Sequence, residues 1–377
     1  MTHRSLGLRL SGLVLVFALA LPYSINAADE RRIVLEPVPA EPSRTLIAMN
    51  SAFVAVLTRQ WADPFPPSRL QVFRHNDTDD ALEPVLDRLV PRAYVHQLVM
   101  SEDVLAVGIE NEFIIYRRIG NRWFPGQSLV GERVAVEGSS VVVAVAGCVM
   151  KVKPPGCQIR TYSVAGSAPV LESEFSRPSV IALALAGGAL YVSEVEFDSE
   201  TGAETKQIRS YIRAANGQWK SVGVIRPERA PESYRFDYGS SLVASPNTLV
   251  IESEFCDAYD GTQSCLILDV TNEPQAKTGT SQTFLYSATD PEFLLRSADQ
   301  QSKAVLAGSR IVVLMNDGSL DHFLLTGEPV PVNESSLSTR LKQQDRRAVA
   351  IAGASSGLAI VVKKRDGTER ELWVSSR

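Results

Sequence analysis

The stretch Leu98-Val99-Met100-Ser101-Glu102-Asp103-Val104-Leu105-Ala106-Val107 decides the fold, because it joins two short apolar strands through a tight polar turn. A third strand that ends near an aromatic residue, Tyr116, follows it, and a second polar turn then leads to Trp123. This strand–turn–strand unit recurs along the chain. Its copies centre on the turn residues Asn50, Ser101, Glu137, Ala186, Ser245, Ala307 and Ala352.

The spacing of these turns is typical of one repeat architecture. Successive turn residues lie 51, 36, 49, 59, 62 and 45 residues apart. The average is about 50, the period of four-stranded propeller blades with loops of variable length. We therefore predict an all-β fold, a seven-bladed β-propeller of four-stranded antiparallel blades. A six- or eight-bladed propeller and a β-sandwich are the alternatives, because the spacing is irregular. Six copies also carry an aromatic residue near the end of the third strand: Phe73, Tyr116, Tyr162, Tyr211, Phe323 and Trp373.

The two ends of the chain complete this pattern. The last copy stops after a third strand, Arg370–Val374, and has no fourth. Near the other end, the apolar segment Arg32–Val38 has no partner in a repeat of its own. Pairing it with the C-terminal strand would remove an exposed sheet edge. We predict that this N-terminal strand closes the last blade.

The first residues have the features of an export signal. Arg4 and Arg9 precede an apolar stretch, Leu13–Leu21, that is too short to span a bilayer. The small residue Ala27 then precedes a cleavage site at Ala28. We predict a signal peptide over residues 1–27 and a single propeller domain over residues 28–377, without a membrane span after the signal is removed. The protein would be periplasmic or secreted.

The composition excludes one class of partner. The chain is 45% hydrophobic and 21% charged, which is typical of a globular protein. Its 38 basic and 43 acidic residues give a net charge of −5. Nucleic-acid binding needs a basic surface that releases counterions from phosphates, so we predict no nucleic-acid partner.

The four cysteines occupy equivalent places in two repeats. Cys148 and Cys157 lie 11 and 20 residues after the turn residue of the third copy, and Cys256 and Cys265 lie equally far into the fifth. This spacing predicts the disulfides Cys148–Cys157 and Cys256–Cys265, each across the loop between a second and a third strand. The spacing fits no common zinc signature, and an exported protein favours disulfides.

Two stretches resemble the FG-GAP repeat of integrin-alpha-like propellers. They are Val99–Gly108, which Tyr116 and Trp123 follow, and Phe236–Ala244, which is similar to the Phe-Gly opening of that repeat. The resemblance implies a propeller and, in that family, calcium-dependent adhesion. However, the chain lacks the Gly-Ala-Pro of the family and its Asp-x-Asp-x-Asp-Gly calcium loop, so calcium binding is not carried over.

We accordingly predict no cofactor. Two acidic turns, Asn76–Asp80 and Asp257–Gly261, carry oxygen ligands that could reach a cation. Such turns are also common on protein surfaces.

Catalytic motifs are scarce. Gly353–Gly357 matches Gly-x-Ser-x-Gly, but a nucleophile elbow joins a strand to a helix, and here two predicted strands flank the motif. We predict a β-turn. Outside the predicted signal peptide, the histidines are His75 in a polar turn, His96 before an inner strand and His322 within a strand. None has a neighbour at a spacing that implies a catalytic dyad.

One face of the predicted ring carries the long loops, and long loops on a rigid scaffold are where binding usually resides. These loops are Thr58–Pro67, Gly147–Cys157, Glu194–Lys206, Arg226–Gly239 and Ser253–Ser264. Their aromatic and arginine residues are candidate interface anchors, unless they pack beneath their own loops. The candidates are Trp61, Phe65, Tyr234, Arg235, Tyr238, Phe255 and Tyr259.

We predict an exported, non-enzymatic binding or scaffold protein that contacts a protein or carbohydrate partner through this face. The alternative is a hydrolase or lyase with a pocket at the mouth of the propeller channel.

Overall fold

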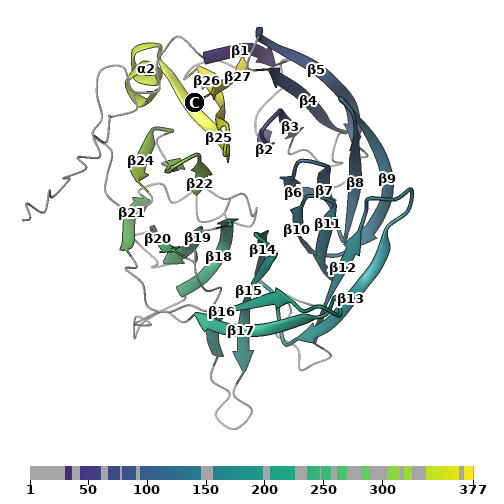
Figure 1. Ribbon diagram of the computed structural model, residues 1–377. Coiled ribbons are helices and arrows are strands. Elements are labelled where there is room, and N and C mark those ends of the chain that lie inside the picture. The colour runs from purple at the N-terminus through teal and green to yellow at the C-terminus, as the bar shows by residue number, and fades with distance from the viewer. Residues whose placement is uncertain are drawn as a thin grey trace, which may run out of the picture.

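Antiparallel sheets stand side by side around a central opening in the computed structural model (Figure 1). The structure describes residues 30–35, 43–60, 67–76, 79–90, 94–145, 156–197, 204–225, 236–246, 248–255, 261–269, 282–288, 304–314, 318–324, 337–364 and 369–376. Over these ranges the chain forms β-strands and one short helix, α2 (Leu337–Gln343).

The sheets follow one another in chain order. Within the described ranges, six sheets have four strands and one has three. The first sheet holds β2 (Ser43–Met49), β3 (Phe53–Gln60), β4 (Ser68–Asn76) and β5 (Asp79–Val90). The second holds β6 (Val95–Met100), β7 (Val104–Ile109), β8 (Glu112–Ile119) and β9 (Arg122–Val130). The third holds β10 (Arg133–Glu137), β11 (Ser140–Ala144), β12 (Cys157–Ser163) and β13 (Val170–Arg177).

The remaining sheets repeat this order. The fourth holds β14 (Ala182–Ala186), β15 (Ala189–Phe197), β16 (Glu204–Arg213) and β17 (Trp219–Ile225). The fifth holds β18 (Phe236–Ser245), β19 (Thr248–Phe255), β20 (Gly261–Asp269) and β21 (Gln282–Ala288). The three-stranded sheet holds β22 (Ala304–Ala307), β23 (Arg310–Leu314) and β24 (Leu320–Leu324). The last holds β25 (Arg346–Ala354), β26 (Gly357–Lys364), β27 (Arg370–Ser376) and β1 (Glu30–Leu35).

The N-terminal strand closes the last blade, as predicted. β1 pairs antiparallel with β27, from Glu30 opposite Ser375 to Leu35 opposite Arg370. The Arg32 guanidinium lies over the Trp373 ring, with its Cζ atom 4.0 Å from the ring centroid. The paired segment is Glu30–Leu35, whereas the predicted strand was Arg32–Val38. The observed pairing therefore begins two residues earlier and ends three residues earlier than predicted.

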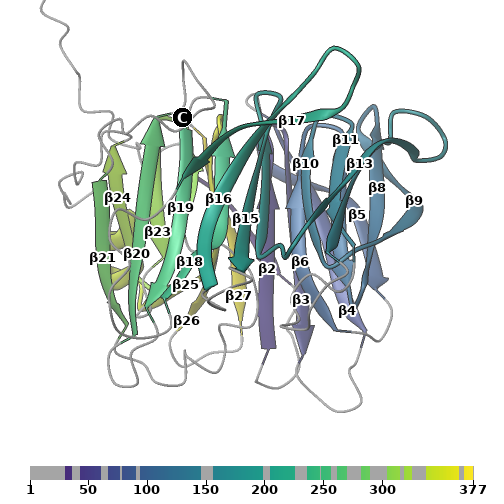
Figure 2. The ribbon, with the colours of Figure 1, turned by 90° about the horizontal axis from the view of Figure 1, so that it is seen from below.

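The first strand of each sheet faces the central opening, and these inner strands contact one another in turn. β2 contacts β6, and the contacts continue through β10, β14, β18, β22 and β25 back to β2. Figure 2 shows the strands running from one face of the ring to the other. This closed circuit excludes the β-sandwich alternative, in which two sheets would pack face to face.

The hydrophobic core is divided into clusters that lie between neighbouring sheets. Strand alternation explains this division, because successive side chains point to opposite sides. Phe53, Ala55 and Leu57 on β3 pack against the second sheet. Val54 and Val56 pack against the last sheet. Similar clusters fill the other junctions between neighbouring sheets, including the two junctions of the three-stranded sheet.

The repeat registers confirm most of the predicted turns. In four sheets, the closing pair of the first hairpin joins a predicted turn residue to the residue three positions later, as for Glu137 and Ser140. In the first sheet, Asn50 closes the hairpin through its hydrogen bond to Phe53. Ser101 makes the same closing hydrogen bond to Val104. The prediction for the last copy was wrong by two residues, because Ala354 pairs with Gly357 and the turn is Ser355-Ser356. The predicted turn residues Ala352 and Gly353 belong to β25 instead. Alanine and glycine occur in inner strands as well as in turns, so the sequence did not distinguish the two positions.

Several predicted loops are shorter than expected. β15 and β16 stay paired as far as Phe197 opposite Glu204, within the predicted loop Glu194–Lys206. β19 and β20 pair as far as Phe255 opposite Thr262, within the predicted loop Ser253–Ser264. Polar residues in these strands misled the prediction, since they form cross-strand contacts such as the 2.9 Å hydrogen bond from Gln207 to Glu194.

Within the described part of the chain, the α-helix falls short of the length and hydrophobicity that a membrane span requires. The predicted signal peptide and its cleavage site at Ala27 and Ala28 lie outside the described residues.

Candidate functional site: the central channel and the two faces

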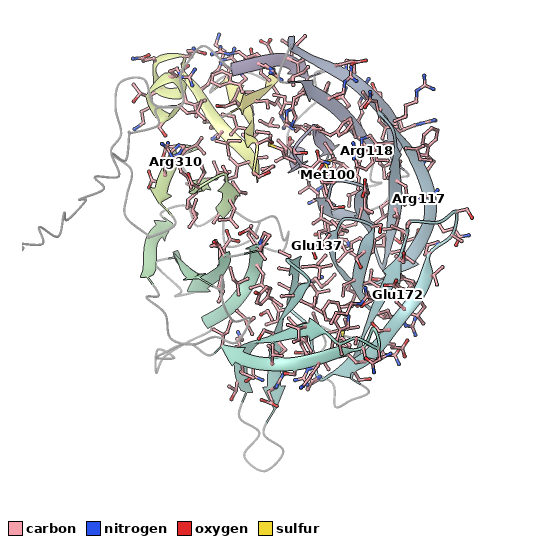
Figure 3. The ribbon with its side chains drawn as sticks, viewed as in Figure 1. Met100, Arg117, Arg118, Glu137, Glu172 and Arg310 are labelled. Atoms are coloured by element: carbon pink, nitrogen blue, oxygen red, sulfur yellow. The ribbon has the colours of Figure 1, made fainter. Side chains whose placement is uncertain are left out.

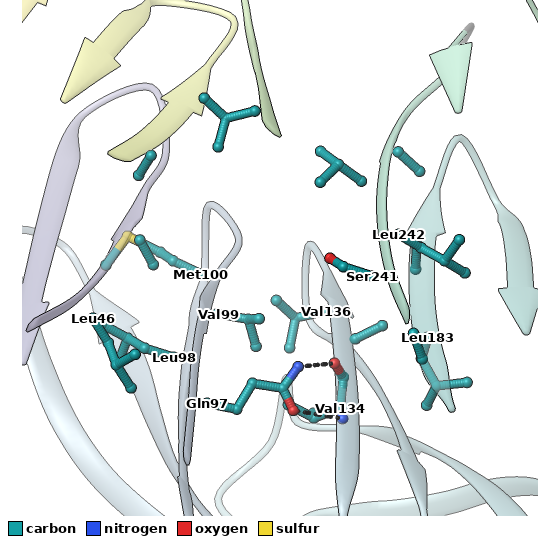
Figure 4. Close-up of a pocket in the computed structure, with 18 of the residues that line it drawn as sticks. Leu46, Gln97, Leu98, Val99, Met100, Val134, Val136, Leu183, Ser241 and Leu242 are labelled. Atoms are coloured by element: carbon teal, nitrogen blue, oxygen red, sulfur yellow. Dashed lines mark hydrogen bonds between the residues drawn. The ribbon is translucent and has the colours of Figure 1, made fainter. Parts of the chain in front are cut away.

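The inner strands enclose a channel with a volume of about 250 Å³ (Figure 4). Its wall is built in layers, because residues equally far from the turn in each repeat stand at the same height. The layer three residues before the turn is aliphatic: Ile47, Leu98, Val134, Leu183, Leu242 and Ile351. The next layer has smaller side chains: Ala48, Val99, Ala135, Ala184, Val243, Val305 and Ala352. The layer beside the turns contains Met49, Met100, Val136, Leu185, Ala244 and Gly353.

The layer four residues before the turns differs from these three, because it carries polar side chains. Gln97, Arg133 and Ser241 belong to it, together with Leu46 and Ala182. The Gln97 amide donates to the Val134 carbonyl at 3.2 Å and accepts from the Val134 N–H at 3.3 Å. This polar layer lies at the end of the channel opposite the short turns, which is the face of the predicted long loops. The channel therefore has one polar mouth and an apolar interior.

Arginine and aromatic residues surround this polar mouth. The Arg59 guanidinium donates to the Val95 carbonyl and lies over the Tyr94 ring, with Cζ 4.8 Å from the centroid. The His96 ring stacks on Tyr94 at a centroid distance of 6.1 Å. Arg133 donates from Nε to the Ile181 carbonyl at 2.7 Å, which ties the third sheet to the start of the fourth.

Each histidine of the described residues is buried in the blades. His96 contacts the Glu110 carbonyl through Nε2 at 3.0 Å. Burial, and then the nearby Arg133 charge, lowers the pKa of His96 from 6.5 to about 4. Burial likewise lowers the pKa of His322 to about 4, with Arg310 adding to the effect. Both rings are therefore neutral at physiological pH.

The prediction that His75 lies in a polar turn was wrong. His75 belongs to β4 and is 4% exposed, and its Nε2 atom lies 3.3 Å from the Asn50 carbonyl. The burial follows from the tight first turn, which brings the β4 end against Asn50. The β-turn interpretation of Gly353–Gly357 is confirmed, because the motif spans the hairpin between β25 and β26. Its Ser356 hydroxyl donates to the Asn50 carbonyl of the next blade at 3.4 Å.

On the opposite face, the short turns are linked to one another around the channel, which the sequence analysis missed. Asn50 donates from its amide to the Ser101 carbonyl at 2.8 Å. The Ser101 hydroxyl donates to the Gly138 carbonyl at 2.7 Å. Glu137 accepts the N–H groups of Gly187 and Gly188 at 2.5 and 3.1 Å. Figure 3 shows Glu137 and Met100 at the inner edge of the ring. In the sequence, the polar residues of these turns were the signal that could have indicated hydrogen bonds between neighbouring blades.

Trp123 and Trp219, each at the start of the fourth strand of its blade, have equivalent roles at the junctions between blades. Trp123 packs edge-on against Phe53 of the preceding blade, with ring centroids 5.5 Å apart. Trp219 donates from Nε1 to the Thr161 hydroxyl of its preceding blade at 2.7 Å. Arg213 and Glu172 form an ion pair across the same junction, and Figure 3 shows Glu172 far from the channel. These residues bind blades together rather than a ligand.

A second hollow, of about 450 Å³, lies on the turn face between the second and third sheets. Arg117 and Arg118 line it, but both are already engaged. Arg117 donates to the Val164 and Ala165 carbonyls at 3.3 Å, and Arg118 pairs with Asp103 at 3.3 Å.

Most of the predicted binding residues lie outside the described residues. This holds for Trp61, Phe65, Tyr234, Arg235 and Tyr259, while Tyr238 and Phe255 are placed only as backbone positions opposite Ser253 and Phe236. In the first predicted cation turn, Asn76 of β4 pairs with Asp79 of β5, while Asp257–Asp260 of the second lie outside the described residues. The described side chains contain no group of three acidic, histidine or cysteine residues that could hold a metal ion. The residues that the sequence analysis missed are Gln97, Arg133 and Ser241, although counting four positions back from each turn identifies them.

The disulfide pairings stay predictions. Cys157 is the first residue of β12, and Cys265 lies within β20 opposite Glu252. Cys148 and Cys256 lie outside the described residues. Peptide mapping without reduction would decide the pairing, and we expect no alkylatable thiol in the mature protein.

Comparisons with known proteins support the fold alone. No protein-family model and no curated protein sequence matches the chain, so the FG-GAP likeness stays a resemblance. The propeller domain of the Trilobed protease from Pyrococcus furiosus superposes with a TM-score of 0.50 at 9% identity, over 90% of this chain and 95% of that one. The Myceliophteria_thermophila Cps50 (Swd1) propeller domain has a TM-score of 0.48 at 12% identity, over 92% and 100%. The Pyrococcus domain is described as having an open velcro topology, whereas β1 closes the ring here. By its structure, the chain is an all-β propeller of four-stranded antiparallel blades.

Proposed function

We propose that this protein is an exported, non-enzymatic binding or scaffold propeller that engages a protein or carbohydrate partner through the face of its longer loops. The observation that carries the proposal is the difference between the two faces. On the turn face, polar groups such as Glu137 and Ser101 are used to hold neighbouring blades together. The connections at the opposite face are mostly longer, as between β3 and β4.

The blade packing supports a scaffold role. Apolar clusters fill the junctions between neighbouring sheets, so the described ring resembles a rigid core that presents loops. The described histidines also have structural surroundings. His75 and His96 are buried and contact backbone carbonyls, and a buried ring is poorly placed to exchange protons with a substrate.

We further propose seven blades. β22 lies between β18 and β25, and contacts both. The three-stranded sheet shares an apolar cluster with each neighbour. It therefore occupies the place of a blade in the circuit. The likeness to integrin-alpha-like repeats, the export signal and the paired cysteines belong to the same proposal, since secreted adhesion domains combine these features.

The test compares two variants of the mature protein. We expect Trp61→Ala, Tyr234→Ala and Arg235→Ala together to remove capture of an envelope partner in a cross-linking experiment, because aromatic and arginine anchors dominate binding energies. The matched control replaces Asn121 and Arg122, exposed residues of the turn face, by alanine. The control variant should capture the same partner as the wild type.

Melting temperatures separate binding from folding. The triple variant should melt with the wild type. Equal capture by both variants would contradict the loop-face proposal, and a large drop in melting temperature of the triple variant would show that the three residues are local core.

A further inference from the structure

At its polar mouth the channel is lined by a charged side chain, Arg133, and Arg59 lies nearby. Among its described lining residues, Arg133 is the one permanently charged group, and none is aspartate or glutamate. Glu132 and Tyr94 act on the Arg133 charge, and His96, which is neutral, lies near both Arg133 and Arg59. The mouth of the channel is thus a site of net positive charge in a protein whose overall charge is −5.

The Arg133 guanidinium is only partly used by the protein. It donates from Nε to the Ile181 carbonyl and from Nη1 to the Glu132 carbonyl, both at 2.7 Å. A guanidinium has five N–H donors, so among the described residues the Nη2 group and one Nη1 hydrogen remain for another acceptor. Burial lowers the pKa of Arg133, which shows that its charge is incompletely solvated. A carboxylate would satisfy these donors in the bidentate geometry that guanidinium favours.

The channel behind Arg133 has room for a small apolar group. Its volume of about 250 Å³ exceeds the roughly 150 Å³ of an engineered apolar cavity that admits benzene. It is smaller than the pockets of about 300–1,000 Å³ that hold drug-sized ligands. The three layers beyond the polar one are aliphatic, and the middle layer is lined by alanine and valine. The site therefore suits a compact apolar body.

The channel wall also offers backbone hydrogen bonds. Each inner strand is the edge of its sheet, since β2, β6, β10, β14, β18, β22 and β25 each end the order of their sheets. Every second N–H and C=O group of such an edge lies on the unpaired side. A purely aliphatic ligand would leave these groups without partners, which costs free energy. A ligand that carries an amide group can replace the water that they would otherwise bind.

We propose that the central channel binds small amphipathic carboxylates that also carry an amide, such as N-acylated apolar amino acids, with the carboxylate on Arg133 and the apolar side chain among the aliphatic layers. Gln97 and Ser241 lie in the same layer as Arg133 and supply further polar contacts to the head of the ligand. This site lies inside the ring and uses none of the candidate loop residues. Its success or failure is consequently independent of the loop-face proposal.

The ligand test uses three probes on the mature protein, with dissociation constants measured by ligand-observed NMR. N-Acetylleucine carries the carboxylate, the amide and the apolar side chain. N-Acetylleucinamide lacks the charge, and octanoate is an apolar carboxylate with a linear chain that lacks the amide. We expect N-acetylleucine to bind at least about ten-fold more tightly than either of the others. Equal affinity for the acid and the carboxamide would overturn the role of Arg133, and tighter binding of octanoate would overturn the requirement for an amide.

Variants test the location of the site. Arg133→Gln should weaken N-acetylleucine about ten-fold and leave N-acetylleucinamide unchanged, while Arg133→Lys should restore part of the affinity because it keeps the charge. Arg122→Gln, on the exposed turn face, is the matched control. Val136→Phe should block both leucine probes, since Val136 lines the channel beside Val99 in Figure 4.

The control for channel filling is Val170→Phe, at a residue that is 60% exposed on β13. It should bind all probes as the wild type does. Melting curves verify that each variant is folded. If Arg133→Gln does not fold, Arg133→Lys provides the test of the Arg133 position. Unchanged binding by folded Val136→Phe, or no binding of N-acetylleucine to the wild type, would overturn the proposal.

Discussion

Glu194 is the residue on which the junction between the third and fourth sheets depends most. Its carboxylate is 0% exposed and accepts two hydrogen bonds from Arg177, at 2.5 and 2.6 Å. Arg209 and Gln207 each add another at 2.9 Å. A buried charge is tolerated only when it is paired and hydrogen-bonded, and here three side chains from two sheets meet that need.

Replacing Glu194 by alanine should therefore be severe. Two partly buried guanidinium groups would lose their counter-charge, and breaking such buried pairs costs about 3–5 kcal/mol. Glu196, on the same strand, is the matched control, because its side chain is 44% exposed and its contact with Arg209 is 3.8 Å long, although it accepts a hydrogen bond from Gln207 at 2.9 Å. Glu196→Ala should cost less than about 1 kcal/mol. Urea unfolding measures both, and equal losses would contradict the assignment.

The buried histidines predict a loss of stability in acid. In the folded protein the pKa of His96 and of His322 is lowered from 6.5 to about 4. Between these values the unfolded chain binds protons that the native state does not, so stability is complete above pH 6.5 and falls as the pH approaches 4. Each histidine contributes at most roughly 3 kcal/mol. His96→Gln should reduce the difference between unfolding free energies at pH 7 and pH 4.5, and an unchanged difference would contradict its burial as a neutral ring.

At the level of elements, the closing strand is the feature with the clearest energetic signature. Leu35 on β1 is 3% exposed and packs in the cluster between the last and first sheets. Val34, its neighbour, is 59% exposed. Leu35→Ala should cost about 2–5 kcal/mol, as for other buried leucines, whereas Val34→Ala should stay within about 0.5 kcal/mol. Chemical denaturation distinguishes them, and similar losses would show that β1 does not bury Leu35 as described.

The elements differ in how far the sequence predicts them. Inner strands and turns were predicted well, because apolar runs such as Val104–Val107 alternate with polar turns at a regular period. Tyr116 and Tyr162 occupy equivalent positions in their sheets. Each lies opposite the second-strand residue that follows the turn residue by four positions. Outer strand segments were predicted less well. Glu194 and Gln207 are polar, as loop residues are, but the pairing of β15 with β16 and the contact of Glu194 with Arg177 place them in strands.

The same distinction applies to the candidate site. An aromatic or arginine residue in a loop is visible in the sequence as an interface candidate. Arg133 cannot be recognised in this way. It becomes a candidate because the inner strands place it in the channel wall, level with residues of other sheets. Gln97 belongs to the second sheet and Ser241 to the fifth. Only the closed ring shows that these three residues share one layer of the channel.

At the scale of the whole molecule, the position of β1 matters more than its connection to the first blade. Glu30 lies opposite Ser375 in an antiparallel pair, so the end of β27 and the start of β1 are adjacent. A short turn could join them as a hairpin. The junction between Leu35 and Ser43 would then become the new pair of chain ends, which lie in the connection between the last and first blades.

A circular permutant that runs from residue 43 to residue 376 and continues through a short turn into residues 30–35 should therefore form the same ring. Every strand keeps its neighbours, and the loop that is opened is short, so loop-closure entropy changes by only about 1–2 kcal/mol. The control is the chain 43–376 without β1, which leaves β27 as an exposed edge and uncovers the apolar cluster around Leu372 and Val374. We expect the permutant to melt within a few degrees of the mature protein and the control to melt well below it. Circular dichroism and calorimetry measure both. If the permutant melts with the control, ring closure requires the natural link to β2, and the order of blades along the chain matters to stability beyond the contacts between them.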